Sequence, residues 1–167
     1  SPPAFSPDGH EIVYGKEGNL WAMTLDGDRH PELLLQSPSS KRFPAVSPDG
    51  RWLSYTSDES GRDEIWVVPY PKPPGKWQIS TNGGADARWV KNGRELIYLE
   101  GRNVMTVEVT TTPSFDFSSP KKLFELPANW NTLFALQPDG ARAVVALNAP
   151  HAEEATQINI VVGWFDE

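Results

Sequence analysis

The residues of this sequence best suited to bind a partner are charged side chains next to glycine-, proline- and serine-rich turns. Arginine and carboxylate side chains form charge-assisted hydrogen bonds, and an exposed tryptophan can anchor a protein surface. The candidates on this basis are Lys41, Arg42, Asp58, Arg62, Asp63, Asp86, Arg88, Trp130 and His151. Trp130 has two interpretations, because it either anchors a partner from a loop or covers the seam between two structural units.

Metal binding is the main alternative for the acidic segment 58–64, Asp-Glu-Ser-Gly-Arg-Asp-Glu. Its carboxylates offer hard oxygen ligands for Ca²⁺, but their spacing differs from that of an EF-hand and Arg62 would oppose a cation. A solvated polar loop is therefore the better interpretation. The histidines at positions 10, 30 and 151 form no His-Glu-x-x-His motif. We expect no metal site and no cofactor.

Catalytic motifs are also missing from the sequence. It has no Gly-x-Ser-x-Gly elbow and no phosphate-binding loop. The chain has no cysteine, which excludes a cysteine nucleophile and a disulfide. We therefore expect no catalytic residues and no enzymatic activity.

Composition and charge restrict the partners further. The chain has 167 residues with 22 acidic and 15 basic side chains, for a net charge of -7. This acidic balance argues against nucleic acid or an anionic membrane surface as a partner. No apolar run approaches the roughly 20 residues of a membrane-spanning helix, so no membrane insertion is expected. The length fits one domain with a sizeable core.

A turn repeated along the chain organises the whole sequence. Ser47-Pro48-Asp49-Gly50 has the residues of a tight turn, and it recurs at positions 6–9 and, with Gln in first place, at 137–140. A weaker copy, Val-Lys-Asn-Gly, lies at 90–93. The turn glycines stand at 9, 50, 93 and 140, so the steps are 41, 43 and 47 residues. Such a period indicates a repeat architecture.

Each repeat contains short apolar runs that alternate in the manner of half-buried strands. We label them a to d and expect four in each of the first three repeats and three in the last, fifteen in all. In the first three repeats the second run has Tyr14, Tyr55 and Tyr98 five residues after the turn glycine. The repeats cover about 1–37, 38–81, 82–127 and 128–167. In the last, run c is expected at 158–165, with no run d after it.

Four strands in a period near 42 residues are typical of a β-propeller blade. The pattern Pro-x-φ-Ser-Pro-Asp-Gly-x-x-φ-x-Tyr, followed by φ-Trp-x-φ, resembles the TolB-like, WD-repeat-like propellers of bacteria; residues 43–68 match it best and 4–26 nearly as well. The C-terminal segment 159–167 resembles the end of bacterial proteins in which such a propeller follows a kinase domain. This resemblance implies a recognition or scaffolding module and favours a periplasmic or other extracytoplasmic location.

The predicted fold is therefore all-β, a β-propeller of four blades whose last blade lacks its outer strand, either closed or part of a larger ring. We expect a protein or small ligand to bind the face formed by the d–a and b–c loops, since binding residues concentrate in variable loops on rigid scaffolds. The alternative is a propeller lyase or hydrolase at the channel mouth. It is disfavoured because Arg88 is the only charged residue assigned to a run a. The incomplete last blade predicts association, including a homo-oligomer that completes the ring.

Overall fold

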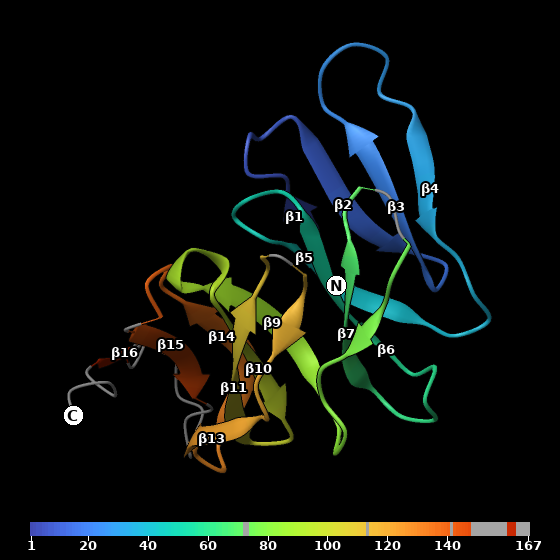
Figure 1. The fold of residues 1–167 in the computed structure, drawn as a ribbon. Coiled ribbons are helices and arrows are strands. Elements are labelled where there is room, and N and C mark those ends of the chain that lie inside the picture. Colours follow the sequence, from blue (N-terminus) through green and yellow to red (C-terminus); the bar gives the residue numbers. More distant parts are fainter. Residues whose placement is uncertain (72–73, 113, 141, 148–159, 163–167) are drawn as a thin grey trace.

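The computed structural model describes residues 1–71, 74–112, 114–140, 142–147 and 160–162, and all the regular structure there is β-sheet apart from one short 3₁₀ turn. Four antiparallel sheets follow one another along the chain (Figure 1). The first sheet contains β1 (Ala4–Phe5), β2 (Glu11–Lys16), β3 (Asn19–Thr24) and β4 (Pro31–Leu35). The second contains β5 (Lys41–Val46), β6 (Trp52–Ser57), β7 (Glu64–Pro69) and β8 (Trp77–Gln78). The all-β prediction is confirmed.

The third and fourth sheets complete the row. The third contains β9 (Ala85–Val90), β10 (Glu95–Glu100), β11 (Asn103–Thr110), β12 (Asp116–Phe117) and β13 (Lys121–Glu125). The fourth contains β14 (Trp130–Leu136), β15 (Arg142–Leu147) and β16 (Ile160–Val162). The described residues thus form sixteen strands instead of fifteen, because β12 pairs with the outer end of β11 in a segment predicted as a loop. The predicted run at 158–165 is described only at β16.

The repeated turn is held by its own side chains. Ser47 donates from Oγ to Asp49 Oδ1 at 2.6 Å and accepts the Trp52 backbone N–H at 3.0 Å. Gly50 closes the turn with a bond to the Ser47 carbonyl at 2.8 Å and a φ of +71°, which glycine adopts without strain. Residues 6–9 repeat this arrangement. In the third blade η1 (Lys91–Gly93) replaces it. The serine and aspartate of the motif therefore serve turn geometry.

The register of the sheets confirms the repeat. Tyr14 lies opposite Trp21, Tyr55 opposite Trp66, and Tyr98 opposite Met105. Each pair joins the second and third strands of its sheet, so the same cross-strand contact recurs in three consecutive blades. The tyrosines aligned from the sequence therefore occupy the same position in the first three sheets.

Hydrophobic cores fill the spaces between consecutive sheets. The first-to-second core contains Val13, Leu20, Ala22, Leu53, Tyr55 and Val68. The second-to-third core contains Ile65, Val67, Ile79, Ala87, Trp89, Leu96, Tyr98, Val107, Val109 and Phe115. The third-to-fourth core contains Val90, Ile97, Leu99, Val104, Leu126 and Ala143. Figure 1 shows the first and fourth sheets at opposite ends of the row, and no core among the described residues joins them.

The first strand of each sheet, predicted as run a, is the inner strand of its blade. In the second and third blades this strand contains a bulge. Phe43 and Asp86 lie seven residues before their turn glycines, with φ of 50° and 54°, and the pairing of each strand with its neighbour shifts there. The extra residues extend the inner strands, so β5 begins at Lys41 and β9 at Ala85. The expectation that Arg88 alone is charged in an inner strand was therefore wrong, because Lys41, Arg42 and Asp86 are in these strands as well.

Candidate functional site

The inner strands of all four sheets line a hollow with a volume of about 370 Å³. This hollow lies on the axis around which the four sheets are arranged. Most of its lining residues are apolar, and Arg88 is the charged residue among those described. The remaining lining residues are Pro3, Ala4, Phe5, Pro44, Ala45, Val46, Pro48, Trp89, Val90, Ala135, Leu136, Gln137 and Pro138. This hollow fits the axial channel of a propeller.

Arg88 is paired with a buried carboxylate of its own strand. Arg88 Nη2 lies 2.6 Å from Asp86 Oδ1, and the Asp86 backbone N–H donates to Thr56 Oγ1 of the second blade at 3.2 Å. Burial raises the pKa of the Asp86 carboxyl, and the Arg88 guanidinium partly offsets this increase. The pair therefore places a half-buried cation at the axis, supported by a carboxylate beneath the surface.

A second ion pair lies between the start of β5 and the b–c loop of the same blade. The Arg42 guanidinium contacts the Asp63 carboxylate through Nη2, and both side chains are roughly half exposed. Arg42 Nε is buried and has no hydrogen-bond partner among the described residues. A guanidinium has five N–H donors, so the half-exposed part of Arg42 keeps hydrogen-bonding capacity beyond the Asp63 carboxylate.

Arg62 covers a buried carboxylate that the sequence did not single out. Arg62 Nε lies 3.0 Å from Glu64 Oε1, and its Nη2 donates to the Thr81 carbonyl at 2.8 Å. Glu64 is almost fully buried and also accepts from Ser80 Oγ and, at 3.0 Å, from the Gly83 backbone N–H. This network ties the b–c loop to the d–a loop, so the main role of Arg62 is structural.

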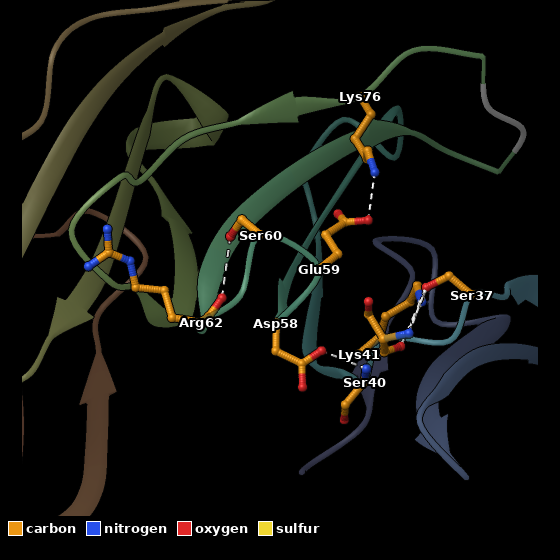
Figure 2. A network of polar contacts seen from close by, with 9 residues as sticks. Ser37, Ser40, Lys41, Asp58, Glu59, Ser60, Arg62 and Lys76 are labelled. Carbon is orange, nitrogen blue, oxygen red and sulfur yellow. Dashed lines mark hydrogen bonds and ion pairs between the residues drawn. The ribbon is translucent and has the colours of Figure 1, made fainter.

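Asp58 and Lys41 are likewise engaged with neighbouring loops (Figure 2). Asp58 accepts the Ser40 backbone N–H at 2.8 Å, while the buried Lys41 ammonium donates to Ser37 Oγ and to the Ser39 carbonyl. Burial lowers the pKa of Lys41, and the negative charge of Glu59 opposes this effect. The Asp58 carboxylate thus holds the d–a loop in place.

The structure therefore brings most of the predicted residues to one face. We call it the loop face; it comprises the d–a segments 36–40, 81–84 and 127–129, the b–c segments 17–18, 58–63 and 101–102, and the adjoining ends of the inner strands. Lys41, Arg42, Asp58, Arg62, Asp63 and Asp86 lie there or at its border, and Arg88 lies deeper on the axis. His151 lies outside the described residues.

Trp130 was placed wrongly by the sequence analysis. It is the first residue of β14 rather than a loop residue, and it lies opposite Leu147. Its half-buried side chain packs against the third-to-fourth core, so the structure favours the seam-covering interpretation.

Metal binding and membrane insertion were both considered as alternatives, and the described residues bear on each. These residues contain no group of three or more histidine and carboxylate side chains placed to hold a metal ion. Within the same part of the chain, no helix has the length and apolarity needed to span a membrane.

The four consecutive antiparallel sheets, the axial hollow and the recurring turn define a TolB-like β-propeller fold, as the sequence pattern predicted. The solved structure of TolB from Acinetobacter baumannii superposes with a TM-score of 0.67 at 17% identity, over 98% of this chain and 43% of that one. The β-propeller domain of Cps50 (Swd1) from Myceliophteria thermophila superposes with a TM-score of 0.61 at 14% identity, over 83% of this chain and 51% of that one.

In sequence, part of the chain is similar to a tricorn protease homolog. Tricorn protease homolog 2 of Streptomyces coelicolor is 34% identical over 80 residues, which are 48% of this chain and 7% of that protein. No family model matches the chain. The chain thus spans less than a tenth of the length of this curated relative and about half or less of the two solved propellers. The likeness to the solved structures shows the fold alone.

Proposed function

We propose that this chain is a non-catalytic binding or scaffolding module that recognises a protein or small ligand on its loop face. The observation that carries the proposal is the Arg42–Asp63 pair, a half-exposed cation and anion held between a strand and a loop of a rigid sheet. Side chains oriented before binding lose less conformational entropy when a partner arrives. The exposed part of the Arg42 guanidinium supplies N–H donors for that partner.

The axial hollow supports binding more than catalysis. An active site needs a nucleophile or a general base within reach of an electrophilic or acid partner. The described lining supplies one charged side chain, Arg88, whose carboxylate partner is already engaged with it. The alternative of a lyase or hydrolase at the channel mouth rests on this Asp86–Arg88 pair, because burial raises the pKa of its carboxyl. The surrounding apolar walls offer no further proton-transfer group.

The two sides of the propeller provide a matched test. Arg51 pairs with Asp49 at 2.8 Å at the a–b turn, on the side opposite the loop face, and its side chain is 57% exposed, against 41% for Arg42. Peptides selected from a random phage-displayed library against the immobilised chain serve as the probe. Their affinities are then measured by calorimetry for the parent chain and for Arg42→Ala, Arg88→Ala and Arg51→Ala.

We expect Arg42→Ala to weaken the selected peptides at least tenfold, equivalent to about 1.4 kcal/mol, while Arg51→Ala leaves their affinity unchanged. A loss with Arg88→Ala in addition would place the peptide at the axial end of the face. Peptides that lose affinity only with Arg51→Ala would contradict the proposal, because they would occupy the opposite side. Turnover of an ester or lactone panel that disappears with Asp86→Asn would instead favour the enzyme alternative.

A further inference from the structure

A second hollow, with a volume of about 320 Å³, lies between the first and second blades. Leu35 of the first blade and Tyr55 and Val68 of the second form its apolar wall, and all three also pack in the first-to-second core. The charged residues that line it are Lys41, Glu59 and Lys76. Ligand pockets commonly have volumes of about 300–1,000 Å³, apolar walls and a few placed polar groups. The hollow therefore has the size and the lining of a site for a small molecule.

Lys41 is the most deeply buried of these charged residues. It is 4% exposed, while Glu59 is half-buried and Lys76 is exposed. The Lys41 ammonium donates to Ser37 Oγ and, at 3.0 Å, to the Ser39 carbonyl, and both acceptors are neutral. An ammonium has three N–H donors, so one donor of Lys41 has no acceptor among the described residues. A lysine is seldom buried to this degree without an opposite charge beside it.

The carboxylate of the hollow, Glu59, is paired with the other lysine. Lys76 Nζ lies 2.7 Å from Glu59 Oε2 and 4.6 Å from the centre of the Trp66 ring. Figure 2 shows the Lys76 and Glu59 side chains pointing toward each other. In the part of the chain that the structure describes, no carboxylate forms an ion pair with Lys41. Two ammonium groups and one carboxylate thus line the hollow, with a net charge of +1 when all three are ionised.

These features define what a ligand of the hollow must carry. Burial lowers the pKa of Lys41; the negative charge of Glu59 opposes this effect, and the positive charge of Lys76 adds to it. An anion beside Lys41 would stabilise the ammonium, because an opposite charge nearby favours the charged form. The apolar wall favours a ligand that also removes apolar surface from water. The hollow is therefore complementary to a small molecule with one negative group and a short apolar body.

We propose that this hollow binds a small organic carboxylate. The carboxylate group of the ligand accepts the remaining N–H of Lys41 and supplies its counter-charge, while the apolar body of the ligand lies against the wall of Leu35, Tyr55 and Val68. Inorganic phosphate shares the negative charge but has no apolar body, so it uses only part of the site. The hollow adjoins the loop face at residues 36–37 and 59, but the Arg42–Asp63 pair does not line it. Binding of a carboxylate here is therefore independent of peptide recognition on the loop face.

The first test uses the parent chain and pairs of probes that differ mainly in charge. Butyrate, hexanoate and benzoate, and the neutral amide of each, are titrated into the ¹⁵N-labelled chain, and amide chemical shifts are followed by NMR. At least one carboxylate should shift the amides of residues 35–37, 41, 59 and 75–76, and its amide and inorganic phosphate should each bind at least tenfold more weakly.

Three results of this titration would overturn the proposal. The first is that none of the three carboxylates binds. The second is that an amide or phosphate binds as tightly as the carboxylates, because the site would then not require both the charge and the apolar body. The third is that the shifts are confined to residues 42, 63 and 86–88, because the carboxylate would then lie on the loop face.

A second test removes the same charge at two places. Lys41→Met should weaken the carboxylate at least tenfold while circular dichroism shows an intact fold. Lys121→Met, at an exposed position of β13 in the third blade, should leave the affinity unchanged. An affinity that Lys41→Met leaves unchanged, or that both variants lower equally, would overturn the proposal. The comparison of carboxylates with amides uses the parent chain, so it decides the matter even where Lys41→Met does not fold. Failure of carboxylate binding would leave peptide recognition on the loop face untouched, and the reverse also holds.

Discussion

Ser47 and Asp49 form a hydrogen bond of 2.6 Å inside the turn that recurs along the chain, and the same serine accepts the Trp52 backbone N–H at 3.0 Å. One hydroxyl therefore joins both strands of the hairpin to the turn. Ser47 is almost fully buried, so water does not replace this acceptor readily.

Ser47→Ala should lower the free energy of unfolding by about 1–3 kcal/mol, because the substitution leaves a buried backbone donor without a partner. Ser118 is the control, since its Oγ also accepts a backbone N–H, that of Glu108 at 3.0 Å, but in an exposed setting. Urea unfolding of both variants measures the difference. Equal losses would mean that the turn hydroxyl contributes no more than an ordinary surface bond.

Two arginine variants test the network around Glu64. Arg62→Ala should destabilise the chain by about 1–3 kcal/mol, because a hydrogen bond to a charged group is lost and the nearly fully buried Glu64 carboxylate loses its cation. Arg102→Ala removes an ion pair with Glu125 in which both partners are about half exposed, and such pairs contribute about 0–1 kcal/mol. Chemical denaturation of the two variants side by side checks the ranking. A larger loss for Arg102→Ala would contradict it.

The turns and rows were predictable from sequence because their determinants are local. Gly50 has a left-handed φ of +71°, which favours glycine at this turn position. A tyrosine follows the turn glycine by five residues in each of the first three blades. The bulges in the inner strands were not predictable, because left-handed backbone angles at Phe43 and Asp86 depend on pairing with a neighbouring strand. Because the bulges were not expected, the predicted inner strands began too late. Lys41, Arg42 and Asp86 were therefore left out of them.

The site was predictable only in part, for a similar reason. The sequence identified Arg62 but not Glu64, whose partners Ser80 and Gly83 belong to a segment 16 and 19 residues further on. Trp130 was assigned to a loop because Pro127 and Asn129 precede it, whereas its pairing with Leu147, 17 residues further on, places it in a strand. Long-range packing decides both cases.

The pH dependence of stability tests the burial of Asp86. Its folded-state pKa is raised, so the folded chain retains the proton to higher pH than the unfolded chain, and this carboxyl lowers stability as pH rises above about 3.8. The parent chain should therefore lose stability relative to Asp86→Asn between about pH 4 and pH 7. Urea unfolding at several pH values measures this difference. A difference that is constant across the range would contradict the raised pKa.

Two leucines test the packing between blades. Leu53 is fully buried in the first-to-second core, whereas Leu33 is 44% exposed at the outer strand of the first blade. Leu53→Ala should cost about 2–5 kcal/mol, the usual effect of a cavity in a core. Leu33→Ala, measured at submicromolar concentration, should cost less than about 1 kcal/mol. Similar losses in thermal and urea melts would show that the first blade is packed differently.

Hydrogen–deuterium exchange tests the loop face most directly as the place of recognition. A peptide selected against the chain is added, and amide exchange is compared with and without it. The account predicts slower exchange in segments 40–42, 58–64 and 81–88, where the Arg42–Asp63 and Asp86–Arg88 pairs lie. Slower exchange confined to the turns at 8–9, 49–50 and 92–93 would place the partner on the opposite side and contradict the account.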